Sequence, residues 1–374
     1  MNKLGFGFMR MPLTDPDDQR AIDLPQVERM ADAFFQAGFT YCDTAWMYHK
    51  FMSEPTVGKA VVARYPRDSF TIASKMPVFM IHSREEGVQT FAAQKEKLGV
   101  DYFDYYLMHN MDHENYELAK KYDMLNFLRE KKASGEIRRL GFSCHDTAEF
   151  LDKVLTECPY FEFVQLQINY LDWEDEEIQS RKCYEVCVKH GKPVIVMEPV
   201  KGGTLANVPD PVKELLQSVH PDWSPASWAL RFAASLPGVE IVLSGMSNMD
   251  QLTENIGFMK DMEPLTSEEV KVLERAAAMI KGTIAIPCTG CRYCVEENSC
   301  PMNLSIPRYF ALYNLAQLHE NSGASEEKAQ YEEIVSQGFG RASECIGCRS
   351  CEAVCPQHIL ISERMQEVSA ALEG

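Results

Sequence analysis

Short apolar runs alternate with longer amphipathic stretches along most of the chain. Eight of the apolar runs are continuous rather than alternating, which is typical of parallel strands buried on both faces. They cover residues 4–9, 39–43, 70–74, 103–107, 139–143, 163–166, 193–197 and 240–244. Apolar positions at helical spacing between them predict helices, among others at residues 24–37, 83–98, 116–134 and 175–190.

Eight strand–helix units in succession favour a closed barrel over a doubly wound sheet. A (β/α)8 barrel takes roughly 250 residues. One more helix is predicted at residues 265–281, and the pattern changes after Lys281. We therefore predict an α/β protein with a TIM barrel at residues 1–281 and a second domain at residues 282–374.

Eight of the 13 cysteines lie in the second domain, in two similar motifs. Each motif is C-x2-C-x2-C followed by Cys-Pro: Cys288, Cys291, Cys294 and Cys300, then Cys345, Cys348, Cys351 and Cys355. Three thiolates at this spacing, with a remote fourth, suit a [4Fe-4S] cluster. The motifs predict a ferredoxin-like domain with two clusters. Structural zinc is the alternative, although zinc usually takes two C-x2-C pairs.

The fourth ligand of each cluster lies outside its triplet. In ferredoxins of the bacterial type it comes from the other motif. We therefore expect Cys355 to complete the cluster of the first triplet and Cys300 that of the second. The first motif has five residues before its Cys-Pro where the second has three, which leaves this crossing open.

Charge and composition narrow the class of partner. The chain has 37 Lys and Arg against 55 Asp and Glu, a net charge of −18, which would repel a phosphate backbone. No apolar run approaches the roughly 20 residues of a membrane-spanning helix, and the first residues lack a secretion signal. Cysteines at metal-binding spacing indicate a reducing compartment. We expect a cytoplasmic protein that binds neither nucleic acid nor membrane.

Four polar residues stand at the ends of three successive strands. Asp43 and Tyr48 follow the second strand, Lys75 ends the third and His109 the fourth, so all four would meet at one rim. An ammonium beside a phenol stabilises the phenolate and lowers its pKa from about 10. Tyr48 would then be a general acid beside Lys75, which Asp43 holds, while His109 orients a carbonyl. The alternative is a structural ion pair, with Tyr48 and His109 as packing residues.

The order Asp43, Tyr48, Lys75, His109 resembles the tetrad of the aldo/keto reductase superfamily, and the likeness runs from about Leu4 to Met262. With the cysteine motifs, the chain resembles the ferredoxin-fused branch. This resemblance implies an oxidoreductase that reduces a small-molecule carbonyl, or oxidises the alcohol, with NADP(H) or NAD(H).

The resemblance also implies cofactor-binding residues at other strand ends. Ser143 and Gln167 match positions that bind the nicotinamide carboxamide. Met197 stands where many members carry a Tyr that stacks on the nicotinamide, and Cys144 where many carry Asn. These two departures weaken the case for an ordinary nicotinamide complex.

The loop after the eighth strand is expected to bind phosphate. It contains a glycine and opens a helix, whose backbone N–H groups and positive dipole end suit an anion. The candidates are Ser244, Ser247, Gln251, Glu254 and Asn255, with Lys201 and Gly202 after the seventh strand for the diphosphate. The loop lacks the Arg and Lys that many members place on a 2′-phosphate.

Two clusters raise a question that hydride transfer does not answer. A hydride carries two electrons at once, whereas a [4Fe-4S] cluster passes them singly, so the clusters are either structural or linked to another group. The second hypothesis is a flavin at the barrel rim, fed through the clusters by ferredoxin or another redox protein. The third is a non-enzymatic redox sensor or electron carrier.

Overall fold

The computed structural model describes residues 3–296, 300–318 and 325–374. The chain divides into two compact units. One consists of Met1–Pro199 with Ser227–Ser267, and the other of Val200–Ala226 with Glu268–Gly374. Within the described residues, no helix is both long and apolar enough to cross a membrane.

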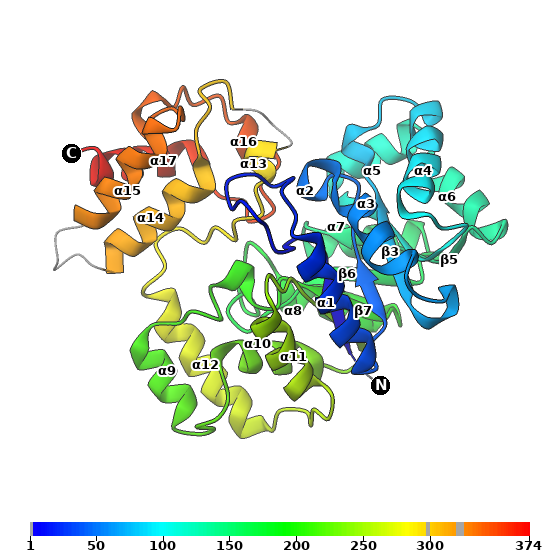
Figure 1. Cartoon of the computed structure of the whole chain (residues 1–374), viewed down its shortest axis with the longest axis horizontal. Helices are drawn as coiled ribbons and strands as arrows, with labels where there is room; N and C mark the ends of the chain where they lie inside the picture. The colour runs from blue at the N-terminus through cyan, green and yellow to red at the C-terminus, as the bar shows by residue number, and fades with distance from the viewer. Residues whose placement is uncertain (1–2, 297–299, 319–324) are drawn as a thin grey trace. The chain divides into compact units, whose positions relative to one another are not determined.

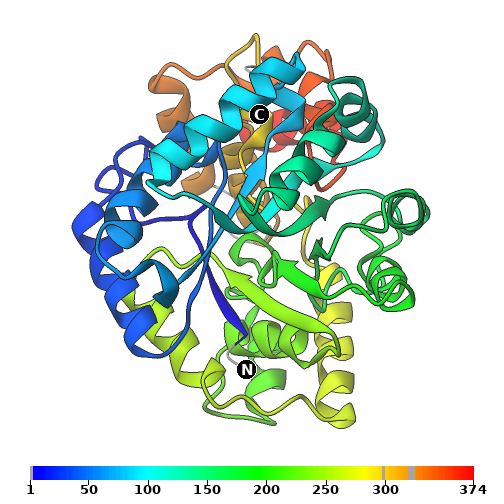
Figure 2. The same cartoon turned by 90° about the vertical axis from the view of Figure 1, so that its right-hand side faces the viewer.

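The first unit is a closed barrel of eight parallel strands that follow one another in sequence order (Figure 1 and Figure 2). The ring closes because β1 pairs with both β2 and β8. The strands are β1 (Leu4–Gly7), β2 (Tyr41–Asp43), β3 (Thr71–Met76), β4 (Phe103–Met111), β5 (Ile137–Cys144), β6 (Phe163–Gln167), β7 (Val194–Met197) and β8 (Val239–Ser244). The predicted TIM barrel is confirmed.

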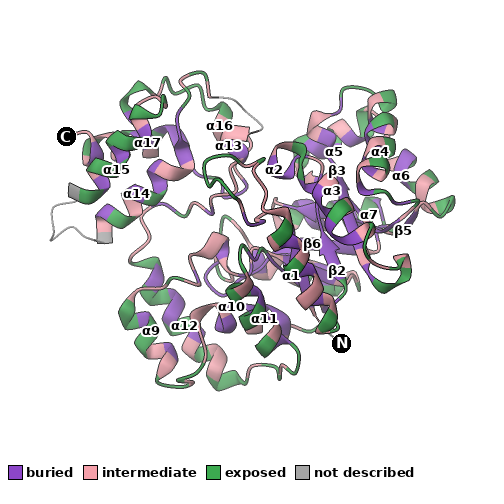
Figure 3. Cartoon of the chain, in the orientation of Figure 1, coloured by how far each residue is buried: buried purple, intermediate pink, exposed green. Residues whose placement is uncertain are grey.

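Helices surround the strands, with their apolar sides inward and their polar sides exposed (Figure 3). They are α1 (Leu24–Gln36), α2 (Tyr48–Phe51), α3 (Ser53–Val57), α4 (Arg84–Leu98), α5 (His113–Lys121), α6 (Met124–Ala133), α7 (Ala148–Glu157), α8 (Ser180–Lys189), α10 (Pro225–Ser235) and α11 (Met249–Met259). The single helix predicted at residues 116–134 is wrong. Asp123 adopts a left-handed conformation with φ 56°, which separates α5 from α6.

Side chains fill the inside of the barrel in layers. Tyr41 on β2, Ala73 on β3 and Leu107 on β4 belong to one buried apolar cluster. Because side chains alternate along a strand, the residues two positions later point to the same side. These are Asp43, Lys75 and His109, which therefore lie one layer nearer the carboxyl ends of the strands, where barrel enzymes carry their active sites.

The second unit is mainly helical. It contains α9 (Asp210–Gln217), α12 (Ser267–Lys281), α13 (Tyr293–Glu296), α14 (Ile306–Leu318), α15 (Ser325–Ser336), α16 (Ser350–Ala353) and α17 (Ile361–Leu372). Its apolar core includes Tyr309, Phe310, Tyr331 and Met365, all fully buried. Cys294 belongs to this core, and several of the other motif cysteines pack against it. The core thus fixes the position of the cysteine motifs.

Candidate functional site

A buried lysine is the centre of the polar group at the barrel rim. The Nζ of Lys75 donates to Asp43 Oδ1 at 2.6 Å, to the Thr44 carbonyl oxygen at 2.8 Å and to the Tyr48 hydroxyl at 3.4 Å. Burial alone lowers the pKa of Lys75, but its interactions with Asp43 and Tyr48 outweigh this effect, so that the pKa is raised. Lys75 is therefore an ammonium ion that faces the phenol oxygen of Tyr48.

Tyr48 stands at the start of a strained turn. The next three residues, His49, Lys50 and Phe51, all have left-handed backbones, with φ of 53°, 50° and 71°. This conformation costs roughly 1–2 kcal/mol per residue. His49 holds the turn, because the Met11 N–H donates to its Nε2 at 3.1 Å while its Nδ1 lies 2.9 Å from the Gln19 carbonyl oxygen. The neutral ring protonated on Nδ1 satisfies both contacts.

His109 completes the group of four. Its ring lies 6.1 Å from that of Tyr48 in an edge-on arrangement and 5.6 Å from that of Phe79, centroid to centroid. Burial, with the nearby charges of Lys75 and His145, lowers the pKa of His109 well below its ordinary value. At neutral pH it is therefore uncharged, and suited to hydrogen bonding rather than to ion pairing.

The backbone of Lys75 is held by a buried polar network that the sequence reading missed. The side-chain amide of Gln94 donates to the Lys75 carbonyl oxygen at 3.0 Å and to Glu54 Oε1 at 2.7 Å. Ser74 donates to the same Glu54 oxygen at 2.7 Å, and Tyr106 donates to Gln94 Oε1 at 2.5 Å. Burial raises the pKa of Glu54. The network therefore fixes the backbone of β3 at Lys75.

The structure places the predicted nicotinamide residues at neighbouring strand ends of the same barrel. Ser143 is buried at the end of β5, where its Oγ accepts the Asn110 N–H at 2.9 Å. Gln167 ends β6 and donates to Asp172 Oδ2 at 2.8 Å, and Met197 ends β7. Asp43 also accepts from Gln165 at 3.5 Å, a residue that the sequence reading did not single out.

The loop after β8 is tied together by side chains. Asn248 caps α11 by accepting the Gln251 N–H at 2.9 Å, and the Gln251 side chain accepts the Ser247 N–H at 2.7 Å. Asn255 donates to the Ser244 hydroxyl at 3.0 Å, which joins α11 to the end of β8. Glu254 is exposed on α11.

A cation that the sequence reading missed lies on this loop. The Arg10 side chain covers Gly245, where a Cβ would lie 3.1 Å from Arg10 Cδ. Ser247 donates to the Arg10 carbonyl oxygen at 2.8 Å, and the guanidinium stands 3.7 Å from Glu198. Arg10 is the third residue after β1, so a positive charge reaches the loop from a distant part of the sequence. No local motif signals it.

Lys201 and Gly202, which the sequence predicts for the diphosphate, directly follow Pro199 and Val200 after β7. They form the short turn η4 (Lys201–Gly203) in the second unit. Lys201 is buried and donates to Gln357 Oε1 at 3.2 Å, and Gly202 packs against the backbone of Thr289. Both neighbours belong to the cysteine-rich segment.

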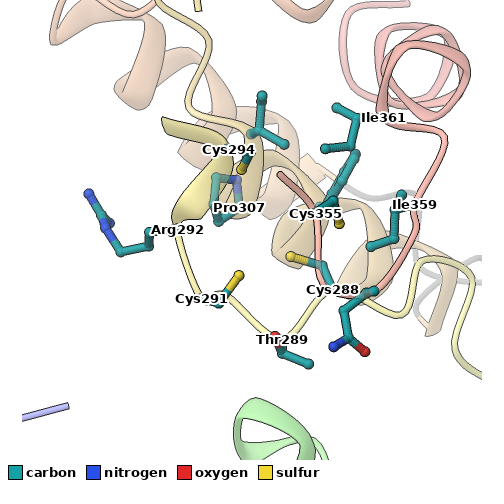
Figure 4. A pocket seen from close by; sticks show the side chains of 12 residues that line it. Cys288, Thr289, Cys291, Arg292, Cys294, Pro307, Cys355, Ile359 and Ile361 are labelled. Atoms are coloured by element: carbon teal, nitrogen blue, oxygen red, sulfur yellow. The ribbon is translucent and has the colours of Figure 1, made fainter. Parts of the chain in front are cut away.

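Four cysteines line one pocket of the second unit (Figure 4). Cys288, Cys291 and Cys294 come from the first motif and Cys355 from the second, and in Figure 4 their sulfur atoms surround one space. The other lining residues are Thr289, Arg292, Ile306, Pro307, Phe310, Gln357, Ile359 and Ile361. Four thiols within a mainly apolar wall fit an iron–sulfur cluster with restricted solvent access.

The remaining motif cysteines lie in a more open part of the same unit. Burial, with the nearby charge of Glu352 and smaller contributions from Cys300 and Cys345, raises the pKa of Cys351 to about 12. Cys348 is exposed, and hydrogen bonds from Ser350 lower the pKa of its thiol. Among the described residues, no three His, Cys, Asp or Glu side chains are arranged to hold a single metal ion.

The first unit is thus a (β/α)8 barrel with a buried group of Asp43, Tyr48, Lys75 and His109 at the carboxyl ends of its strands. Residues 3–278 match the aldo/keto reductase family, and residues 287–360 match the 4Fe-4S dicluster domain. The chain belongs to the aldo/keto reductase family, carries a C-terminal 4Fe-4S ferredoxin-type domain, and is an oxidoreductase.

Relatives of known sequence match about two thirds of the chain. An aldo-keto reductase of Mycobacterium sp. (strain MCS) is 29% identical over 255 residues, which is 66% of this chain and 81% of that protein. The uncharacterized oxidoreductase YqkF of Bacillus subtilis (strain 168) is 23% identical over 279 residues, 65% of this chain and 85% of that one.

Solved structures share the barrel fold. The thermostable aldo-keto reductase Tm1743, in complex with the inhibitor epalrestat, has a TM-score of 0.59 at 21% identity and covers 73% of this chain and 94% of its own. Aldo-keto reductase AKR11C1 from Bacillus halodurans, in its holo form, has a TM-score of 0.58 at 23% identity and covers 73% of this chain and 91% of its own. The Klebsiella pneumoniae aldo-keto reductase in complex with NADPH has a TM-score of 0.56 at 21% identity and covers 73% of this chain and 90% of its own.

Proposed function

We propose that this oxidoreductase reduces a carbonyl, or oxidises the corresponding alcohol, with NADP(H) or NAD(H), and that Tyr48 is its general acid. The observation that carries the proposal is the buried ammonium of Lys75, which bridges Asp43 Oδ1 at 2.6 Å and the Tyr48 hydroxyl at 3.4 Å. An ion pair that served stability alone would not need a phenol as its third member.

The residues of the rim divide the work of proton transfer. Tyr48 holds the proton that passes to the carbonyl oxygen of the substrate, and Lys75 stabilises the phenolate that remains. Asp43 keeps Lys75 charged and in place. Uncharged His109 hydrogen-bonds the substrate carbonyl and orients it towards Tyr48. When bound, the reduced nicotinamide supplies the hydride that the carbonyl carbon accepts.

The rim and the loop after β8 fit such a dinucleotide. Ser143 and Gln167 carry polar groups at the ends of β5 and β6 for the carboxamide, and Met197 offers an apolar side chain for the ring. The first turn of α11 and the guanidinium of Arg10 together suit a phosphate. Ser244, Ser247, Gln251, Glu254 and Asn255 would shape this loop, chiefly through the hydrogen bonds that tie it to β8 and α11.

In the second unit we propose two [4Fe-4S] clusters that transfer electrons. Cys288, Cys291, Cys294 and Cys355 would hold the first, and the supporting observation is their shared pocket. Cys300, Cys345, Cys348 and Cys351 would hold the second. The exposure of Cys348 favours the second cluster as the one that exchanges electrons with ferredoxin or another redox protein.

The cofactor that the protein retains separates this proposal from a flavin-containing reductase. Protein purified without oxygen is mixed with NADPH, the nucleotide seen in the Klebsiella pneumoniae neighbour, freed of excess by gel filtration and denatured. We expect mass spectrometry of the released small molecules to find about one NADP(H) per chain and no flavin. Release of a flavin without retained nucleotide would contradict hydride reduction by NADPH and assign the rim to a flavin.

A further inference from the structure

The turn after β7 lies against the walls of the first cysteine pocket. Gly202 has a left-handed backbone with φ 64°, and a Cβ at this position would overlap the carbonyl oxygen of Thr289. Thr289 directly follows Cys288 and lines the same pocket. Only a glycine allows this approach, so Lys201 is held next to the cysteine motif.

The side chain of Lys201 makes a second contact with the pocket wall. It is only 3% exposed, and its Nζ donates to Gln357 Oε1 at 3.2 Å. Gln357 comes two residues after Cys355 and also lines the pocket. Two independent contacts, one on each cysteine motif, therefore hold a buried amine beside the proposed site of the first cluster.

A [4Fe-4S] cluster held by four thiolates is an anion, and reduction adds one more negative charge. Nearby charge and hydrogen bonding are among the factors that set the potential of such a cluster. A cation beside the pocket favours the reduced form, because its attraction grows with the charge of the cluster.

We propose that Lys201 places a positive charge beside the first cluster and thereby raises the reduction potential of that cluster. The proposal rests on the assignment of Cys288, Cys291, Cys294 and Cys355 to that cluster. It gives a role to the turn after β7 that differs from binding the diphosphate of a dinucleotide. The second cluster, held by the other four cysteines, is not affected by this contact.

The test is an anaerobic redox titration followed by electron paramagnetic resonance in Lys201→Met, Lys201→Gln and Lys201→Arg. We expect the neutral variants to lower the potential of the first cluster by about 59 mV, which is a tenfold change in the reduction equilibrium. Lys201→Arg keeps the charge, so the reduction equilibrium constant of the first cluster should stay within about threefold of that of the wild type. Lys201→Gln keeps a donor for Gln357 and serves if the Met variant does not assemble its cluster.

Controls separate this inference from the proposals on which it rests. Lys213→Met removes an exposed lysine of α9 and should change neither potential. The signal that shifts should be the one that Cys355→Ala abolishes; if that variant abolishes the other signal, the cluster assignment fails rather than the role of Lys201. Unchanged potentials in the neutral variants would overturn the inference. If NADPH binding were also weaker in these variants, Lys201 would instead be a residue that binds the dinucleotide.

Discussion

Replacing Tyr48 with Phe is expected to lower kcat for carbonyl reduction by about 10²–10⁴-fold, the range that a general acid contributes. The change removes only the hydroxyl that Lys75 contacts at 3.4 Å, whereas the bond from Lys75 to Asp43 at 2.6 Å remains. The fold, the iron content and the dissociation constant for NADPH should therefore stay close to those of the wild type. Steady-state kinetics and fluorescence titration with NADPH measure the two effects separately.

The barrel offers a matched control in Tyr41→Phe. Tyr41 is buried on β2, two residues before Asp43, and its hydroxyl has no hydrogen-bond partner among the described residues. Losing this hydroxyl should leave turnover unchanged. Wild-type turnover in Tyr48→Phe would remove Tyr48 from the mechanism, and an equal loss in both variants would point to a general effect on the barrel.

The second large effect is the loss of individual clusters in cysteine variants. Cys355→Ala should lose the cluster of the first motif and thus about half of the iron, because the structure brings Cys355 to the pocket of Cys288, Cys291 and Cys294. The double variant with Cys355→Ala and Cys291→Ala should lose no more iron than Cys355→Ala alone, since both residues would serve one cluster. The double variant with Cys355→Ala and Cys348→Ala should lose nearly all of the iron, because it would lack a ligand of each cluster. Iron analysis and cluster absorbance after anaerobic purification give the result.

The double variants decide how the motifs are paired. If Cys355 instead served its own motif, Cys355→Ala with Cys348→Ala would keep half of the iron and the combination with Cys291→Ala would lose it all. Cys187→Ala is the control, because this buried cysteine lies on α8 in the first unit and its loss should leave the iron content unchanged.

Much of the fold follows from local patterns. Most residues of the barrel strands are buried, so most of these strands appear in the sequence as short apolar runs. The carboxyl ends of parallel strands share one rim, which is why Asp43, Lys75 and His109 were expected to lie together. The break at Asp123 was not predictable from amphipathicity, because the residues on either side keep a helical pattern.

The supporting residues of the site could not be predicted in the same way. Glu54 lies on α3 and Gln94 on α4, and no motif in either helix predicts the hydrogen bonds that join them to each other and to the Lys75 backbone. Arg10 reaches the loop after β8 from the other end of the barrel sequence. The contact of Lys201 with Gln357 joins residues 156 positions apart, and no motif predicts it. Such contacts depend on tertiary structure rather than on a motif.

The fate of a deuterium label tests the central claim most directly. NADPH deuterated at both C4 positions is incubated without oxygen with the wild-type protein and a panel of aldehydes and ketones, including 4-nitrobenzaldehyde. The proposed mechanism predicts an alcohol that carries one deuterium on its carbinol carbon for each NADPH oxidised, and a loss of this product in Tyr48→Phe. Oxidation of NADPH only in the presence of a one-electron acceptor such as a viologen, with no deuterium in any alcohol, would contradict it.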